Sequence, residues 1–343
     1  MQAELKQPEN LIVDLPKQTR VSLGTAIVLG LVRGKMETKP TTAYLMTYRR
    51  DKCLSNCSFC PQAKESKSRA DMLSRVSWPA FPTEQVINRL QETVNSGEIK
   101  RTCIQALNYP ETIRHIQMLV REIRQTTKVL VSVSFQPLKH ENIRLLADAG
   151  VDRISISLDA ATEELFEKVK GKYVGGLYEW QRQLELLKEG VSVFGKWKVS
   201  THLIVGLGET EQDMIQTIQR CVHMGVLPVL FAFTPIRGTP LENRSQPAIQ
   251  AYRRIQVARY LLLQRNVKYE EMLFDNEGRI SDFGASKQSL LRIVKNGKPF
   301  LTSGCPDCNR PYYNEKPSGP IYNYPRDLTE KELSEIRTQL GLD

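Results

Sequence analysis

The sequence has no long hydrophobic run. Its longest apolar stretch, Val21–Val32, is interrupted by polar residues and glycines, namely Ser22, Gly24, Thr25 and Gly30. A helix that crosses a bilayer needs about 20 consecutive apolar residues. The first residues, Met-Gln-Ala-Glu-Leu-Lys-Gln, are polar and do not resemble a signal peptide. We therefore expect a cytoplasmic protein that does not associate with membranes.

Acidic residues are too few to balance the basic ones. The 48 Lys and Arg exceed the 38 Asp and Glu, which leaves a net charge of +10. Such an excess attracts acidic partners over long distances, either nucleic acid or an acidic protein domain. No run of Lys and Arg is interleaved with aromatic residues, and no RNA-binding module is recognisable. Nucleic acid is therefore the less favoured partner.

Three of the seven cysteines, Cys53, Cys57 and Cys60, stand within eight residues at the spacing C-x3-C-x2-C. Three thiols this close can bind three irons of a [4Fe–4S] cluster and leave the fourth iron open. A zinc knuckle would need a fourth Cys or His nearby, and none occurs between residues 61 and 102. The spacing resembles the signature of radical S-adenosylmethionine (SAM) enzymes, in which SAM binds the open iron and is reduced to a 5′-deoxyadenosyl radical.

From Thr41 onward, short apolar runs rich in β-branched residues alternate with amphipathic stretches, a pattern typical of βα units that build a parallel sheet. We predict six strands: Ala43–Thr47, Thr102–Leu107, Val129–Phe135, Arg153–Leu158, Val199–Val205 and Pro228–Phe233. Helices are expected at Thr83–Ser96, Thr112–Gln125, His140–Ala149, Glu163–Val169, Leu177–Glu189 and Glu211–Met224. No long break marks a reversal of strand order, so the pattern favours an α/β fold of the open (β/α)6 barrel type over a doubly wound sheet.

Two regions lie outside this pattern. Residues 1–42 are expected to form an N-terminal extension with a helix from about Lys17 to Gly34. The barrel should occupy residues 43–245, and residues 246–343 should form a C-terminal region. That region is expected to contain helices near Ile249–Arg265 and Thr329–Leu340, with an irregular tail between them.

Active sites of such barrels lie at the carboxyl ends of the strands. The triple-cysteine loop follows the first strand directly. The fourth strand ends in Ser157-Leu-Asp159, whose polar groups can hydrogen-bond a ribose diol, although Asp159 could instead cap the next helix. The fifth strand ends in Ile204-Val-Gly206, where the glycine allows close backbone approach and Ile204 could lie against an adenine ring.

Five ordered motifs resemble those of biotin synthase and its relatives over about residues 43 to 241: Cys53-x3-Cys57-x2-Cys60-Pro-Gln, Cys103-Ile-Gln-Ala-Leu-Asn108-Tyr-Pro110, Ser157-Leu-Asp159, Ile204-Val-Gly206-Leu-Gly-Glu209 and Gly238-Thr-Pro-Leu241. The resemblance implies a radical SAM [4Fe–4S] cluster on the three cysteines and SAM as cofactor. It also implies a SAM pocket formed by Phe59 beside the adenine, Ser157 and Asp159 near the ribose, Ile204 and Gly206 at the base, and Arg182 at the carboxylate.

The chain departs from biotin synthases at their second cluster, which three Cys and an Arg bind inside the barrel. Cys103 stands at the first of these positions, but the other two correspond to Val131 or Ser132 and to Ser200. His202 replaces the usual glycine two residues before Ile204 and is either a core residue or part of the site. A biotin synthase type of second cluster therefore lacks most of its ligands.

The tail offers a replacement, Cys305-Pro-Asp-Cys308-Asn-Arg310-Pro-Tyr-Tyr-Asn-Glu. A C-x2-C turn chelates a metal and needs further ligands from elsewhere. Cys103 is the best remaining candidate, because Cys221 falls on the apolar face of a predicted helix, where a thiol usually acts as a small hydrophobe. We therefore expect Cys103, Cys305 and Cys308 to bind an auxiliary [4Fe–4S] cluster.

This barrel and tail together resemble the larger component of the two-protein lipoyl synthases found mostly in archaea. The resemblance implies sulfur insertion at C6 or C8 of an octanoyl chain bound to a lysine. The implied partners are an octanoylated lipoyl carrier domain, a second radical SAM lipoyl synthase component and an electron donor such as a ferredoxin. Two alternatives remain, a biotin synthase-like enzyme acting on a small molecule and an RNA-modifying iron–sulfur protein.

Overall fold

The computed structural model describes residues 15–343, so the polar stretch at the start of the chain lies outside the described residues. An eight-stranded sheet has the order β10-β9-β8-β7-β6-β2-β1-β5. The six strands from β2 to β10 pair in parallel with their neighbours. They are β2 (Thr42–Thr47), β6 (Arg101–Gln105), β7 (Leu130–Ser134), β8 (Arg153–Ser155), β9 (Val199–Val205) and β10 (Leu227–Ala232). The predicted α/β fold with six parallel strands in sequence order is confirmed, and no pairing of the two edge strands closes the barrel among the described residues.

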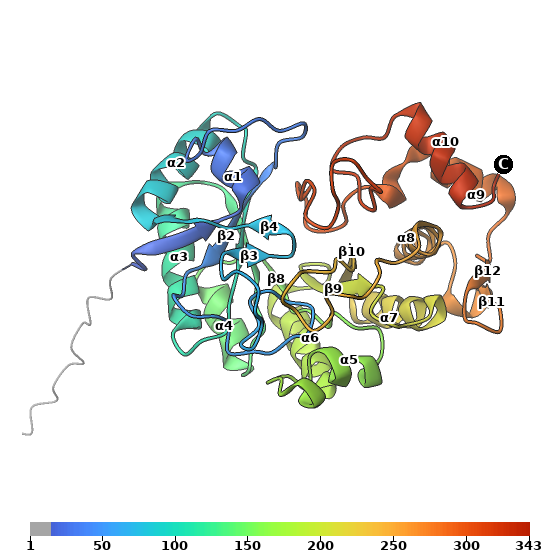
Figure 1. Cartoon of the computed structure of the whole chain (residues 1–343), viewed down its shortest axis with the longest axis horizontal. Coiled ribbons are helices and arrows are strands. Elements are labelled where there is room, and N and C mark those ends of the chain that lie inside the picture. Colours follow the sequence, from blue (N-terminus) through green and yellow to red (C-terminus); the bar gives the residue numbers. More distant parts are fainter. Residues whose placement is uncertain (1–14) are drawn as a thin grey trace, which may run out of the picture.

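Helices follow the outside of the curved sheet, from α2 and α3 at one side of Figure 1 through α4 and α6 to α7 and α8. They are α2 (Thr83–Asn95), α3 (Thr112–Thr126), α4 (Glu141–Asp148), α5 (Glu163–Val169), α6 (Trp180–Phe194), α7 (Glu211–Met224) and α8 (Ile249–Leu263). Capping residues in the local sequence determine where some of these helices begin and end. In α7, Thr210 and Asp213 form a reciprocal capping box, and Gly225 ends the helix at a φ of 74°.

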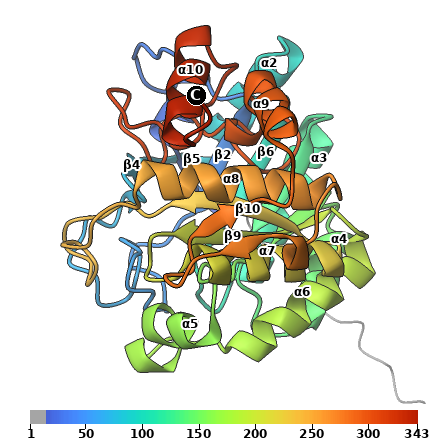
Figure 2. The ribbon, with the colours of Figure 1, turned by 90° about the vertical axis from the view of Figure 1, so that its right-hand side faces the viewer.

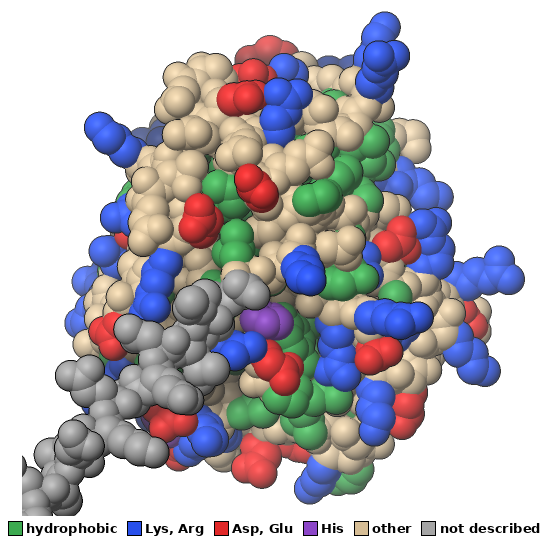
Figure 3. Space-filling view, turned by 90° about the vertical axis from the view of Figure 1, so that its left-hand side faces the viewer, with side chains coloured by type: hydrophobic (Ala, Val, Ile, Leu, Met, Phe, Trp, Pro, Cys, Tyr) green, Lys and Arg blue, Asp and Glu red, His purple; other side chains and the backbone are tan. Residues whose placement is uncertain are grey.

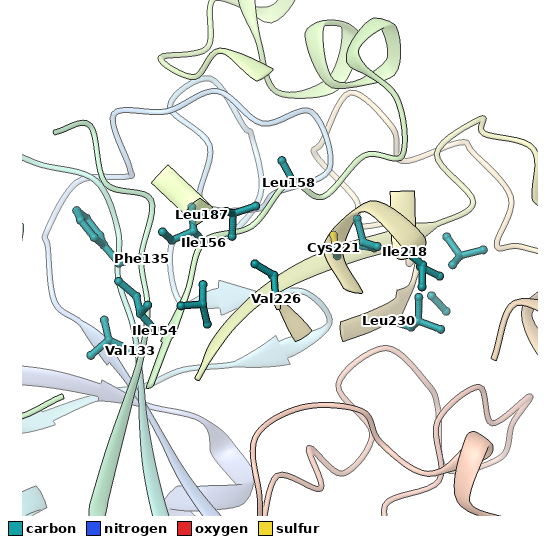
Figure 4. Close-up of a cluster of buried hydrophobic side chains, with 14 of the residues drawn as sticks. Val133, Phe135, Ile154, Ile156, Leu158, Leu187, Ile218, Cys221, Val226 and Leu230 are labelled. Atoms are coloured by element: carbon teal, nitrogen blue, oxygen red, sulfur yellow. The ribbon is translucent and has the colours of Figure 1, made fainter. Parts of the chain in front are cut away.

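The hydrophobic core lies between the sheet and these helices. Figure 4 shows Ile156 beside the sheet, Leu187 of α6, and Ile218 and Cys221 of α7 within this cluster. Each fully buried Ile or Leu side chain of this cluster stabilises the fold by roughly 1.5–3 kcal/mol. Cys221 has no exposed surface, and its burial raises the pKa of its thiol to about 12. It packs as a small hydrophobe, as predicted from its place on the helix.

The N-terminal segment differs from the prediction. The helix expected from Lys17 to Gly34 is wrong in its first part, because Gln18–Val21 forms strand β1. This strand pairs antiparallel with β2 and with β5 (Ala80–Pro82) and so extends the parallel sheet. Only Leu23–Val28 is helical (α1), and it begins where the Ser22 side chain accepts a hydrogen bond from the Thr25 N–H.

The C-terminal region packs beside the edge of the sheet at β10. Figure 2 shows α8 in front of β9 and β10, with α9 and α10 above it. The elements here are β11 (Leu273–Phe274), β12 (Ile280–Asp282), α9 (Lys287–Asn296) and α10 (Glu330–Gln339), of which only α10 was predicted. The short strands β3 (Met72–Leu73) and β4 (Val76–Ser77) and three 3-10 turns (Lys172–Val174, Tyr269–Glu271, Lys298–Phe300) complete the structure. In the described part of the chain, none of the helices is both long and apolar enough to cross a membrane.

Candidate active site

The triple-cysteine loop follows the end of β2 and is folded around one lysine. The ammonium of Lys52 donates to the carbonyls of Pro61, Ser66 and Ser68 at 2.9, 2.5 and 2.7 Å. Within the loop, the Cys53 N–H donates to the Gln62 carbonyl at 3.0 Å. An ammonium has three donors, and all three are used here. Lys52 therefore ties both ends of the cysteine loop to the segment that follows it.

The three thiols of this loop line one cavity of about 140 Å³. The Asn108 N–H donates to the Cys53 sulfur at 3.2 Å. Burial raises the pKa of the Cys60 thiol to about 12 and that of Cys57 well above its ordinary value. Without a metal, the Cys57 and Cys60 thiols are protonated at neutral pH, so metal binding must release their protons.

Lys170 and Asp159 form an ion pair at the wall of the same cavity. The Lys170 ammonium lies 2.6 Å from Asp159 Oδ2, and the lysine side chain is 1% exposed. Lys170 also donates to the Ser157 carbonyl and lies 5.1 Å from the ring centre of Tyr178. It is the basic residue at the cysteine cavity, and the sequence interpretation did not single it out.

Arg182 lies elsewhere. It is on α6, pairs with Glu185 at 3.7 Å, and lines neither this cavity nor the larger one described below. The structure therefore does not bring Arg182 to the other predicted cofactor residues, and the basic side chain on the wall of the cysteine cavity is Lys170.

The two polar residues after β8, Ser157 and Asp159, differ in whether they line the cavity. Asp159 lines the cavity, and its backbone has a φ of 66°, a conformation that is uncommon for a residue other than glycine. It does not cap the next helix, because Thr162 does so by accepting from the Leu165 N–H. Ser157 is buried and lines neither cavity, and its carbonyl accepts from Gln136 and Lys170. Of the two predicted ribose ligands, only Asp159 lies at the cavity.

A larger cavity of about 240 Å³ adjoins the first and shares Phe59, Cys60 and Asp159 with it. Ile204, which was predicted to lie against an adenine ring, lines this larger cavity. Gly206 does not line it. The Gly206 N–H donates to the Glu209 carboxylate at 2.6 Å, and this carboxylate also accepts from the Leu207 and Gly208 N–H groups. The Glu209 carboxylate therefore stabilises the glycine turn at the end of β9, and Gly206 is not part of the cavity wall.

The tail enters the barrel from the opposite end, where the strands begin. The Asp307 carbonyl accepts from the hydroxyls of Thr41 and Thr42, both at 2.7 Å, just at the start of β2. Arg101, the first residue of β6, donates to the Pro306 carbonyl at 3.1 Å. These contacts hold the Cys305–Cys308 turn beneath the cavity. Cys103, Cys305 and Cys308 all line the larger cavity, so the structure brings together the three thiols predicted for the second cluster.

Each of these three sulfurs has a polar side chain beside it. Gln105 Nε2 donates to Cys103 at 3.2 Å, the Ser132 hydroxyl donates to Cys305 at 3.6 Å, and the Tyr44 hydroxyl lies 3.4 Å from the Cys308 sulfur. A Cβ atom on Gly304 would approach the Cys308 sulfur to 3.0 Å, so the turn needs a glycine there. This donor set fits thiolates, which are the form that binds iron.

The arrangement of the two cysteine sets is compatible with iron–sulfur clusters. Among residues 15–343, no three His, Cys, Asp or Glu side chains converge closely enough to hold one ion. A cluster binds its thiolates at separate irons, so its cysteines stand around a cavity without meeting at a point.

The register of the strands shows which residues face the cavity at the positions where this chain departs from biotin synthases. Cys103 pairs with Ser132, so Ser132 faces the cavity and Val131 is buried in the core. Ser200 also lines the cavity. His202 lies there as well, with its ring 4.7 Å from that of Phe231, and burial lowers its pKa to about 3. His202 is therefore a neutral residue of the cavity wall.

The positive charge of the chain is not gathered into one stripe on the face drawn in Figure 3. Lys and Arg side chains on this face are separated by acidic and uncharged ones. A nucleic-acid-binding surface usually shows a continuous basic patch. This face therefore gives no support to the RNA-modifying alternative.

The radical SAM superfamily matches residues 49–221. Among curated proteins, the biotin synthase of Persephonella marina is 27% identical over 207 residues, which are 59% of this chain and 57% of that protein. Biotin synthase 2 of Corynebacterium diphtheriae is 26% identical over 266 residues, covering 74% of this chain and 73% of that protein. This chain therefore spans less than two thirds of the first of these relatives.

Two solved structures have a similar fold. Methylornithine synthase matches with a TM-score of 0.50 and 14% identity over 70% of this chain and 66% of that one. HydG, a maturase of the [FeFe]-hydrogenase, matches with a TM-score of 0.51 and 14% identity over 70% of this chain and 53% of that one. At this identity the likeness concerns the fold alone.

Proposed function

This chain belongs to the radical SAM superfamily, and we propose that it inserts sulfur at an unactivated C–H carbon of a substrate held between two iron–sulfur clusters. The observation that carries the proposal is the larger cavity. Phe59, Cys60 and Ile204 line it near the carboxyl ends of the strands, and Cys103, Cys305 and Cys308 line it near their beginnings. A substrate in this cavity would lie between the two sets of thiols.

The two bound groups would supply the reactive chemistry: SAM on the first cluster a radical that removes a hydrogen atom from carbon, and the second cluster a sulfide. The protein supplies position and environment. Cys53, Cys57 and Cys60 hold the first cluster, while Phe59, Ile204 and Asp159 surround the place of the nucleoside. The apolar walls of the cavity exclude water from a reactive carbon. Those walls include Leu73, Ile154, Val229, Phe231 and Phe233.

The first substrate candidate is a small molecule, as in the relatives named biotin synthase. The support is the similarity of the barrel, which extends over most of this chain in one of these relatives. Arg310 also lines the cavity and could meet a polar end of such a substrate. This candidate needs no partner other than an electron donor, for which a ferredoxin is a suitable class.

A second candidate is an octanoyl chain on a lipoyl carrier domain, with sulfur added at C6 or C8 and a second radical SAM component making the other C–S bond. The specific observation in its favour is that two of the three auxiliary thiols come from the tail motif Cys305–Cys308. An unbranched acyl chain also suits an apolar cavity. The net charge of +10 favours an acidic carrier domain.

The experiment compares both substrates with the same enzyme. The reconstituted, reduced protein is incubated with SAM and either an octanoylated carrier peptide or dethiobiotin. The masses of the products are then measured by mass spectrometry. A Cys305→Ala/Cys308→Ala variant is the control. Sulfur gained by either substrate, and lost in the control, supports sulfur insertion and identifies the substrate. Sulfur insertion that persists in the control, or SAM cleavage without sulfur gain on either substrate, contradicts the proposal.

A further inference from the structure

The sulfurs of the two tail cysteines are each approached by a hydroxyl of the barrel. Tyr44 is on β2 and its hydroxyl lies 3.4 Å from the Cys308 sulfur, while Ser132 is on β7 and its hydroxyl lies 3.6 Å from the Cys305 sulfur. Both residues are buried, with exposed fractions of 2% and 3%. These contacts join strands of the barrel to a segment more than 150 residues later in the chain, since the two pairs are 264 and 173 residues apart.

The direction of each hydrogen bond follows from the second partner of each hydroxyl. The Arg310 backbone N–H points to the Tyr44 oxygen at 2.9 Å, and a backbone N–H can only donate. The Tyr44 proton is therefore left for the Cys308 sulfur. In the same way, Arg101 Nη1 donates to the Ser132 oxygen at 3.0 Å, which leaves the Ser132 proton for Cys305. Arg101 is itself fixed by an ion pair with Asp152 at 2.9 Å.

We propose that Tyr44 and Ser132 are positioning residues of the auxiliary cluster, oriented by Arg310 and Arg101 so that each donates a hydrogen bond to one tail thiolate. The inference rests on the proposed function, because it assumes that Cys305 and Cys308 bind a cluster. Hydrogen bonds to the ligand sulfurs of a cluster are among the factors that set its reduction potential. A donor stabilises the more negative, reduced state, so these hydroxyls raise the potential. They also hold the tail turn against the barrel.

The potential is measured in a protein that retains only the second cluster, a Cys53→Ala/Cys57→Ala/Cys60→Ala variant reconstituted with iron and sulfide. Tyr44→Phe and Ser132→Ala are added to this parent singly and together. An anaerobic redox titration followed by electron paramagnetic resonance should give a more negative midpoint for each single variant and the most negative midpoint for the combination.

Tyr313→Phe is the matched control. Its ring centre lies 5.2 Å from that of Tyr44, and its hydroxyl makes no hydrogen bond to a sulfur. Removing this hydroxyl should leave the midpoint of the parent unchanged. A midpoint that is unchanged by Tyr44→Phe and by Ser132→Ala, or that moves as much in Tyr313→Phe, overturns the tuning role.

A second readout needs no cluster. Loss of the Tyr44 hydroxyl frees the Arg310 N–H, so hydrogen exchange of the 305–313 peptide in the metal-free chain should be faster in Tyr44→Phe than in the wild type or in Tyr313→Phe. Unchanged exchange overturns the contact itself. If the parent binds no iron, the proposed second cluster fails, and the exchange measurement still decides whether Tyr44 holds the tail.

Discussion

Lys170 and Asp159 form a buried ion pair, with Lys170 Nζ 2.6 Å from Asp159 Oδ2, on the wall of the cavity that holds the first three cysteines. Removing one partner of a buried pair leaves the other charge without compensation, which costs about 3–5 kcal/mol. Lys170→Met should therefore lower the free energy of unfolding by about that amount and weaken SAM binding. Urea denaturation and equilibrium dialysis with SAM measure the two effects.

Lys168→Met is the control for this prediction. Lys168 pairs with Glu164 four residues earlier on the surface of α5, with side chains 58% and 77% exposed. Such exposed helical pairs contribute little to stability, because the surrounding water screens the two charges. If Lys168→Met destabilises the chain as much as Lys170→Met does, burial of the Lys170 pair is not the cause.

Iron analysis should show that each of the two cysteine sets binds its own cluster. Two four-iron clusters would give about eight irons and eight sulfides per chain, and loss of either set should leave about four of each. Cys57→Ala should also abolish the production of 5′-deoxyadenosine from SAM. The Cys305→Ala/Cys308→Ala variant should retain it, because the first set lies on a different loop. Zinc bound through the tail cysteines would contradict the second site.

His202 should make the fold less stable in acid. Burial, with Arg310 and Lys170 as smaller causes, lowers its pKa to about 3. The pKa of an unfolded histidine is about 6.5, so below that pH only the unfolded chain takes up the proton. Stability from this residue is complete above pH 6.5 and is lost as the pH falls towards 3. Between pH 7 and 5 the loss should be about 2 kcal/mol.

The test compares urea midpoints at pH 7 and pH 5 for the wild type and His202→Gln. The variant should lose less stability than the wild type over this interval. Equal losses in the two proteins would show that other groups account for the acid sensitivity.

Salt should distinguish the two substrate candidates. Binding of an acidic carrier domain to a basic enzyme weakens as ionic strength rises, because the screening length falls to about 8 Å at physiological salt. Dethiobiotin is a small acid and should show no comparable loss. Isothermal titration calorimetry from low to physiological salt measures the affinity of the enzyme for the carrier domain and for dethiobiotin. Carrier binding that is insensitive to salt would argue against docking driven by the net positive charge of the chain.

The parallel strands were predictable because each is a short β-branched run followed by an amphipathic helix. Strand β1 was not, because Gln18–Val21 is stabilised by pairing with β2 and β5, partners distant in sequence. That Cys103, Cys305 and Cys308 lie at one cavity was predictable by assigning each of the seven cysteines a place. Lys170 was missed, since the turn after α5 and not the helix spacing brings it to Asp159, and Tyr44 was missed because one tyrosine in a strand gives no signal of its contact with a tail thiol.

The split of the second site between β6 and the tail has a consequence for the order of maturation in the cell. The first site is complete once the ribosome has made the chain to Val205, the end of β9. About 100 further residues are needed to reach Cys308, which at 5–20 residues per second takes roughly 5–20 s. If both cysteine sets bind clusters as proposed, only the first set could be loaded during that interval. The iron–sulfur assembly machinery would then meet Cys53, Cys57 and Cys60 before the tail cysteines.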